Sequence, residues 1–262
     1  MAEKIIEMED VTVRFNGNTV LDNVSLDVLR GDVIGIVGPN GGGKTTLLNA
    51  ILGNVKIASG SIRIFGEDHT KFRAFKKIGH VSQHAIQFDP VFPATVEEIV
   101  ALGCISRKKL GKRLTHGDKK AILSALELVE IMDVRKKKIS ALSGGQKQRV
   151  FIAKAIVHNP ELLILDEATT GLDVCIQDRF IDLLQKLKSE RDITVMTVSH
   201  DISGVMCQAN KLAVVNREVS LMDITPTSDP TPLLRDAYGE HFTFVVHHAP
   251  EECKPNLEES DG

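Results

Sequence analysis

The first third of the chain alternates apolar and polar residues in a way that predicts β-strands. The runs KIIEMEDVTVRF (residues 4–15) and TVLDNVSLDV (19–28) place apolar side chains at roughly every second position, and the turn sequence FNGN joins them. The next run, VIGIV at 33–37, has no polar residue, which predicts a fully buried strand. Two half-buried strands followed by a buried one indicate an N-terminal antiparallel β subdomain that leads into the core.

The rest of the chain alternates strand-like and helix-like runs, which is typical of an α/β protein with a mostly parallel sheet. SGSIRIFGED (59–68) predicts a hairpin. Apolar runs that predict strands are KIGHVSQ (77–83), ELLILDE (161–167), ITVMTVSH (193–200) and KLAVVN (211–216). Runs with the three-to-four spacing of helices are LLNAILG (47–53), TVEEIVALG (95–103), KKAILSALELVEIM (119–132), QKQRVFIAKAIVHN (146–159) and VCIQDRFIDLLQKLKSE (174–190).

These patterns predict the domain organisation. One domain is expected over residues 1–225, with its core in 1–92 and 157–225 and a helical subdomain at about 93–156. The remaining 226–262 form a C-terminal extension. It begins with turn-rich sequence, and its acidic, proline-containing end is predicted to be disordered.

A glycine-rich loop follows the buried strand and precedes a helix. Its residues are Gly38, Pro39, Asn40, Gly41, Gly42, Gly43, Lys44, Thr45 and Thr46. The spacing of Gly, four residues and Gly-Lys-Thr in this context predicts a phosphate-binding loop rather than an ordinary turn. Gly41 and Gly43 allow the backbone to wrap around a phosphate. Lys44 can reach the β- and γ-phosphates, and the Thr45 hydroxyl can bind Mg²⁺.

Two carboxylates end the apolar run LLILDE. Asp166, at the end of the strand, is placed to bind Mg²⁺, and Glu167 can orient an attacking water. Acidic residues are common at strand ends, so this pattern gains its meaning from the phosphate loop that precedes it. Together they predict a nucleotide-hydrolysing site.

Three further residues are candidates with ordinary alternatives. Gln83 and His200 each follow a predicted strand, and parallel strands bring their carboxyl ends to one edge of a sheet. The alternative for Gln83 is a polar residue that ends a strand, and the alternative for His200 is a surface histidine beside Asp201. Phe15 can stack on an adenine ring or belong to the core.

The sequence LSGGQ at 142–146 resembles a phosphate site that lacks a lysine. A serine and two glycines open a predicted helix, so that backbone N–H groups at the positive end of the helix dipole can meet an anion. The chain thus carries two surfaces suited to phosphate.

The motifs GPNGGGKTT, VSQ, LSGGQ, LLILDE and SHD occur in this order, and the chain therefore resembles the ATP-binding cassette (ABC) transporter ATPases over residues 3–225. LSGGQ separates this family from other phosphate-loop ATPases. The resemblance implies a RecA-like phosphate-loop NTPase core with a mostly parallel sheet, an antiparallel β subdomain and an inserted helical subdomain. It also implies an ATPase whose cofactors are ATP and Mg²⁺.

The resemblance assigns roles to residues. The catalytic residues are Glu167 and His200, and the Mg²⁺ ligands are Thr45, Gln83 and Asp166. The nucleotide-binding residues are Phe15, Gly38 to Thr46, Gln83, the D-loop residue Asp173 and, from a second copy, Ser143, Gly144 and Gly145. An ATP-dependent homodimer is therefore implied. The chain departs from the family where Ala168 follows Glu167, since proline is usual there.

Within the family, VFPATVEEIV, TGLD and VSHDISGVM resemble the importers of zinc, manganese or iron. The implied function is to energise metal import through integral membrane permeases, with an extracytoplasmic metal-binding protein as an indirect partner. The protein would be peripheral, at the cytoplasmic face of the membrane. The alternatives are an ATPase for another solute such as an iron–siderophore, a soluble ABC ATPase acting on DNA or ribosomes, and a regulatory module without turnover.

Composition changes this picture little. The formal net charge of -3 gives no overall attraction to nucleic acid, and no nucleic-acid partner is expected. The start of the chain lacks a signal peptide, and no apolar run is long enough to span a membrane. The four cysteines lie far apart, which predicts neither a zinc ribbon nor a disulfide framework.

Two charged features have competing interpretations. The basic stretches at 107–113 and 135–138 are either solvated helix faces or surfaces for an anionic membrane partner. His241, His247 and His248 are either incidental or join Cys253 in a metal site, although their spacing matches no closed site.

Overall fold

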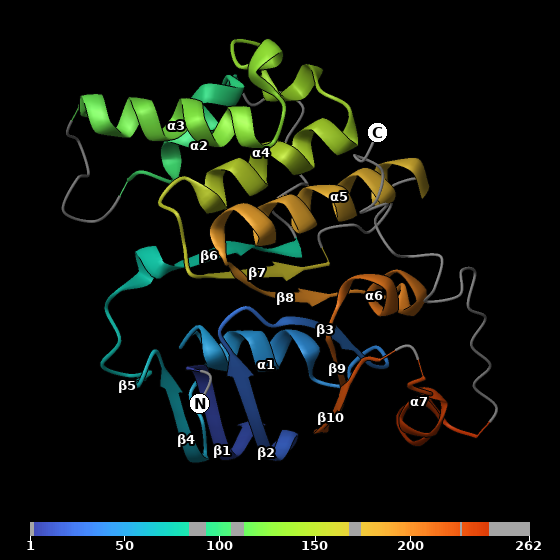
Figure 1. Ribbon diagram of the computed structural model, residues 1–262. Coiled ribbons are helices and arrows are strands. Elements are labelled where there is room, and N and C mark those ends of the chain that lie inside the picture. The colour runs from blue at the N-terminus through green and yellow to red at the C-terminus, as the bar shows by residue number, and fades with distance from the viewer. Residues whose placement is uncertain (1–2, 84–92, 106–112, 168–173, 226, 241–262) are drawn as a thin grey trace. The chain divides into compact units, whose positions relative to one another are not determined.

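A computed structural model describes residues 3–83, 93–105, 113–167, 174–225 and 227–240, and the side chains of the helix after 173 from residue 182 onward. The chain forms two compact units (Figure 1). The first contains Met1–Lys71 and Met196–Gly262, and the second contains Phe72–Val195. Each unit is described by itself.

The N-terminal part of the first unit is an antiparallel sheet with strand order β2-β1-β4-β5. Its strands are β1 (Lys4–Phe15), β2 (Asn18–Leu29), β4 (Ser59–Ile64) and β5 (Glu67–Asp68). Val11 and Val13 of β1 pair with Val24 and Leu21 of β2, and all four side chains are buried. The predicted alternation therefore places one face of this sheet in the core.

The other part of the first unit is α/β. Strand β3 (Val33–Val37) pairs in parallel with β9 (Lys211–Asn216), and β10 (Glu218–Asp223) pairs antiparallel with β9. The helices are α1 (Lys44–Ile51), α6 (Ile202–Gln208), which contacts β3, and α7 (Thr231–Tyr238), which contacts β9 (Figure 1).

A buried polar cluster fixes the start of both parallel strands. The Lys211 ammonium lies 2.9 Å from Asp32 Oδ2, which also accepts a 2.8 Å hydrogen bond from the Leu29 N–H. Asn210 donates to Asp32 Oδ1 at 3.1 Å and accepts from the Val33 N–H at 2.7 Å. The residue before β3 and the two residues at the start of β9 are thus joined by side chains as well as by the sheet.

The second unit pairs two parallel strands and contains most of the helices. Strand β6 (Ile78–Val81) pairs with β7 (Leu162–Asp166), with Val81 opposite Leu165. The helices are α2 (Val96–Leu102), α3 (His116–Leu128), α4 (Gly144–Ile156) and α5 (Val174–Arg191), with 3₁₀ turns at Phe75–Lys77, Met132–Val134 and Ile139–Ala141. Helices α2, α3 and α4 contact one another. Strand β8 (Thr194–Val198) contains the boundary between the units.

The predicted fold class is confirmed: the structure is α/β, with parallel strand pairs, a separate antiparallel sheet and an inserted group of helices. The sequence did not predict β10 or α7. The predicted domain boundaries stay predictions. Cys207 is disulfide-bonded, which the sequence analysis did not predict, and Cys104 is a buried thiol.

Candidate nucleotide-binding site

The glycine-rich loop lies between β3 and α1 in the first unit, and Lys44 is the first residue of the helix. The Lys44 side chain is buried, and its ammonium donates hydrogen bonds to the carbonyl oxygens of Gly38 at 2.8 Å and Pro39 at 3.0 Å. Pro39 also accepts from the Gly42 N–H at 3.0 Å. Lys44 therefore holds the two ends of its own loop together.

The loop rests on the end of β9. A Cβ placed on Gly38 would lie 2.0 Å from the carbonyl oxygen of Val215, so the two backbones approach as closely as a glycine allows. The Arg217 N–H donates to the Gly42 carbonyl at 2.8 Å. The position of the loop is thus determined by β3, which precedes it, and by β9, which supports it.

This arrangement suits an anion. The N-terminus of α1 presents backbone N–H groups at the positive end of the helix dipole, beside a lysine ammonium. Asn40, Gly41 and Thr45 are exposed. A phosphate chain can therefore reach the loop from solvent, and the Thr45 hydroxyl is accessible to a cation.

Two other predicted residues of the first unit are at its surface. Phe15 ends β1 and is 46% exposed, which excludes it from the core and leaves its ring available for stacking. His200 is exposed and follows β8. It directly precedes Asp201, whose carboxylate caps α6 by accepting a 3.0 Å bond from the Gly204 N–H.

The second unit brings Gln83 and Glu167 together. Gln83 follows β6, Glu167 follows β7, and the Gln83 amide nitrogen donates a 2.5 Å hydrogen bond to the Glu167 carboxylate. Glu167 has a positive φ of 50°, which few residues other than glycine adopt. Asp166, at the end of β7, is only 5% exposed. The two carboxylates thus occupy different environments although they are adjacent in sequence.

Ser143 caps helix α4 through a reciprocal pair of hydrogen bonds. Its hydroxyl accepts from the Gln146 N–H at 3.3 Å, and the Gln146 side chain accepts from the Ser143 N–H at 3.2 Å. Ser143 and Gly144 are exposed, and Gly145 is half-buried. The start of the LSGGQ helix is therefore at the surface, with its first N–H groups directed out of the helix.

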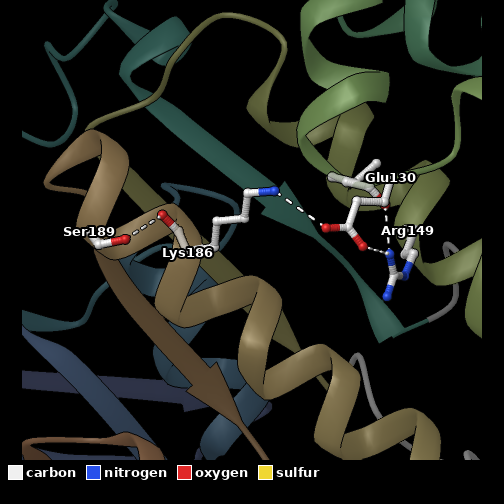
Figure 2. Close-up of polar contacts among 5 residues, drawn as sticks. Glu130, Arg149, Lys186 and Ser189 are labelled. Carbon is white, nitrogen blue, oxygen red and sulfur yellow. Dashed lines mark hydrogen bonds and ion pairs between the residues drawn. The ribbon is translucent and has the colours of Figure 1, made fainter. Parts of the chain in front are cut away.

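A cluster of charged residues that the sequence analysis missed ties α4 to α5 (Figure 2). Glu130 accepts hydrogen bonds from Arg149 of α4 at 3.2 Å and from Lys186 of α5 at 3.3 Å. Arg149 also donates to the Val129 carbonyl at 2.9 Å. Hydrogen bonds from Arg149 and Lys186 hold the pKa of Glu130 below its ordinary value. These contacts join α4, which begins within the LSGGQ motif, to α5.

A cavity of about 640 Å³ opens beside this charged cluster. Glu130, Arg149 and Lys186 line one part of it, and Ser143 and Gly145 line another. The LSGGQ motif thus borders a hollow within its own unit as well as the surface.

Comparisons with known proteins decide the family. The sequence model described as ABC transporter matches residues 21–170. The chain is 44% identical over 216 residues to the zinc uptake system ATP-binding protein ZurA of Listeria innocua, covering 82% of this chain and 84% of that protein. It is 36% identical to the manganese transport system ATP-binding protein MntB of Bacillus subtilis, covering 92% and 94%.

The chain belongs to the ABC transporter family. Solved ATP-binding cassettes share its fold. CbiO1 of Clostridium perfringens, part of the ABC transporter complex CbiONQ, has a TM-score of 0.74 at 30% identity over 85% of this chain and 89% of that one. An ATP-binding cassette in its ADP conformation has a TM-score of 0.77 at 25% identity, over 90% and 98%.

The protein is therefore an ATP-binding ATPase subunit of the ABC transporter family, and it works in complexes with membrane permeases. Among its described residues, none of the helices combines the length and the apolar character needed to cross a bilayer.

Several candidates of the ABC ATPase lie outside the described residues: Ala168, Asp173, residues 107–112, His241, His247, His248 and Cys253. Within the ranges that the structure describes, no group of three or more His, Cys, Asp or Glu side chains could hold a metal ion. Lys136, Lys137 and Lys138 are exposed at the surface of the second unit.

Proposed function

We propose that this ABC ATPase energises the import of a metal ion, namely zinc, manganese or iron, through partner membrane permeases. The observation that carries the proposal is its similarity to ZurA and MntB over 82% and 92% of the chain. Such long matches include the helical unit as well as the nucleotide-binding motifs. The ATPase is placed at the cytoplasmic face of the membrane, and an extracytoplasmic metal-binding protein delivers the substrate to the permeases.

In the proposed reaction, residues 38–46 hold the phosphates of ATP and Phe15 stacks on adenine. The ammonium of Lys44 exchanges its two carbonyl partners for phosphate oxygens, which carry full negative charge and bind it more strongly. His200, exposed after β8, stabilises the γ-phosphate.

Mg²⁺ fits the donor set of this ABC ATPase. Thr45 supplies a hydroxyl, Asp166 a buried carboxylate and Gln83 an amide oxygen, and all three are the hard oxygen ligands that Mg²⁺ prefers. When bound, the ion neutralises charge on the β- and γ-phosphates. The Gln83 amide nitrogen is already bonded to Glu167, so its oxygen is the atom left for the ion.

Glu167 is the proposed catalytic base. Its carboxylate is held by Gln83, so that an acceptor for the proton of the attacking water is in a defined position before ATP binds. Gln83 would thus both hold the Glu167 carboxylate through its amide nitrogen and offer its amide oxygen to Mg²⁺.

We further propose that two copies bind head to tail around two ATP molecules. Each nucleotide lies between the Lys44 loop of one copy and Ser143, Gly144 and Gly145 of the other. ATP then joins the copies, and hydrolysis with Glu167 and His200 releases them. Opening and closing of this homodimer supplies the motion that the permeases use.

Replacing Glu167 by Gln tests the catalytic assignment. In the purified transporter complex, Glu167→Gln should still bind ATP but hydrolyse it about 100-fold more slowly or worse, because the amide cannot accept a proton. Glu190→Gln, an exposed carboxylate near the end of α5, is the matched control and should keep normal turnover. Normal hydrolysis by Glu167→Gln would refute the assignment.

Uptake of radioactive zinc, manganese and iron by cells lacking the gene tests the substrate class. The wild-type gene should restore uptake of one of these metals, and Glu167→Gln should not. Restoration of iron–siderophore uptake alone would favour the alternative solute. Copurification with ribosomes or DNA, and not with a permease, would overturn the transport function.

A further inference from the structure

The C-terminal helix α7 ends beside the phosphate loop, which gives the C-terminal extension a connection to the nucleotide site. Both lie in the first unit. Helix α7 contacts β9, and its residue Leu234 is completely buried. Helix α7 is therefore packed against the sheet, and its contacts near the loop come from an ordered helix.

Helix α7 and the loop contact the same short segment, residues 215–217, at and just after the end of β9. On one side, the carbonyl oxygen of Val215 closely approaches Gly38, and the Arg217 N–H donates to Gly42. Between these two, the Asn216 amide nitrogen donates a 3.0 Å hydrogen bond to the carbonyl of Ala237, in the last turn of α7. A single short segment thus carries both the loop and the helix.

Tyr238, the last residue of α7, makes the second connection. The Tyr238 hydroxyl lies near the backbone of Gly38, and burial raises the pKa of the phenol whereas this contact lowers it. Burial is the main influence on this phenol and raises its pKa above the ordinary value of 10.0, so the hydroxyl stays neutral at physiological pH. The same residue, Gly38, accepts a hydrogen bond from the Lys44 ammonium through its carbonyl.

We propose that α7 is a support for the phosphate loop and that Tyr238 and Asn216 are positioning residues for ATP binding. They act through Gly38 and the end of β9, and they do not themselves touch the nucleotide. The inference rests on the proposed role of residues 38–46. It assigns the C-terminal extension, as far as Tyr238, to the nucleotide site.

The chain offers a direct probe, because Tyr238 is its single tyrosine and it has no tryptophan. Full-length protein grown with ring-¹³C tyrosine gives the NMR signals of one ring. Titration with Mg-ADP should shift these signals. Titration with inorganic pyrophosphate and Mg²⁺ should shift them in the same direction, because the loop and not the adenine transmits the effect.

Two variants remove one polar contact each. Tyr238→Phe removes the hydroxyl that lies near Gly38, and Asn216→Asp removes the donor to Ala237. Each should weaken Mg-ADP binding roughly three- to tenfold, the range expected for one hydrogen bond. The KM for ATP should rise by a similar factor while kcat stays within about twofold, which is the pattern for loss of uniform binding. Asp236→Asn, at an exposed position of the same helix, should bind as the wild type does.

The outcomes separate the two proposals. Normal Mg-ADP binding by Tyr238→Phe and Asn216→Asp, with an unresponsive Tyr238 signal in the wild type, would overturn the supporting role of α7. If Lys44→Ala also binds Mg-ADP normally, the proposed phosphate loop itself is wrong. Should Tyr238→Phe fold poorly, the NMR titration of the wild type and the Asn216→Asp variant still decide the question.

Discussion

Two glycines of the phosphate loop are expected to respond very differently to the same substitution. Gly38 and Gly41 lie three residues apart, and both have positive φ, +152° and +79°. A Cβ on Gly38 would lie 2.0 Å from the carbonyl oxygen of Val215, whereas a Cβ on Gly41 would meet nothing within 4 Å. Alanine at the two positions therefore separates the cost of backbone conformation from the cost of collision.

The conformational cost alone is modest. For Gly41→Ala, holding an L-residue in the left-handed region costs about 1–2 kcal/mol. Gly53 has a φ of +70° and equally open surroundings at the end of α1, and Gly53→Ala should lose a similar amount. Gly53→Ala is thus a matched control that lies outside the loop.

Gly38→Ala adds a collision that the fold cannot easily relieve. A carbon and a carbonyl oxygen need at least 3.0 Å, so the two backbones must separate by about 1 Å. Val215 is buried in β9, which pairs with β3 and supports Gly42. Overpacking of this kind costs about 1–3 kcal/mol, so we expect a total loss of about 2–5 kcal/mol for Gly38→Ala.

Urea unfolding of the full-length variants, followed by circular dichroism, measures these losses. With a slope of about 2–3 kcal/mol per molar, Gly38→Ala should unfold at a midpoint about 1 M lower than Gly41→Ala. Mg-ADP binding by Gly38→Ala should weaken as well, because the loop has moved away from β9. Equal midpoints for the two variants would refute the argument, since the contact with Val215 would then be absent from the protein in solution.

Two further predictions concern other parts of the chain. Asp32→Ala should lower the free energy of unfolding by about 3–5 kcal/mol, because it leaves the ammonium of Lys211, only 14% exposed, without its carboxylate. Urea unfolding should show that adding Lys211→Met to Asp32→Ala restores part of this loss. A loss below about 1 kcal/mol for Asp32→Ala would contradict the argument. Ser143→Arg should leave ATP binding by the monomer intact while abolishing ATP-driven dimerisation, measured by sedimentation in the Glu167→Gln background. Loss of ATP binding by the monomer would mean that the LSGGQ helix contacts the nucleotide of its own copy and not that of the partner.

The strands could be predicted from the sequence because their signal is local. Residues 4–15 form β1 as the alternation predicted, and the solid apolar run at 33–37 forms β3. Helix α7 could not be predicted in this way. It has eight residues in a turn-rich stretch, and its one fully buried side chain, Leu234, is buried by packing on β9. The helix is amphipathic, but its eight residues give only about two turns of pattern, and a helix this short needs a tertiary contact to be stable.

In the candidate site, too, residues that follow a local pattern could be predicted, and a residue whose partners are distant in sequence could not. Gln83 and Glu167 were found because each follows a strand and parallel strands end together. Glu130 was missed because the helical spacing continued past it to residue 132. In the structure α3 ends at Leu128, and Glu130 has a φ of 59° that faces its side chain toward Arg149 and Lys186. Partners so far apart along the chain leave no mark on local periodicity.

The capping geometry of Ser143 explains how one hydroxyl can serve its own helix and a second nucleotide. The oxygen accepts a hydrogen bond from the Gln146 N–H, which uses a lone pair and leaves the hydroxyl proton free to donate. An incoming γ-phosphate can therefore accept hydrogen bonds from the Ser143 hydroxyl and from the N–H groups of Gly144 and Gly145 while the cap stays intact. No lysine is needed, since the proposed partner copy already supplies Lys44 to the same phosphate. The capped start of α4 can thus bind a nucleotide that is held by the phosphate loop of the other copy.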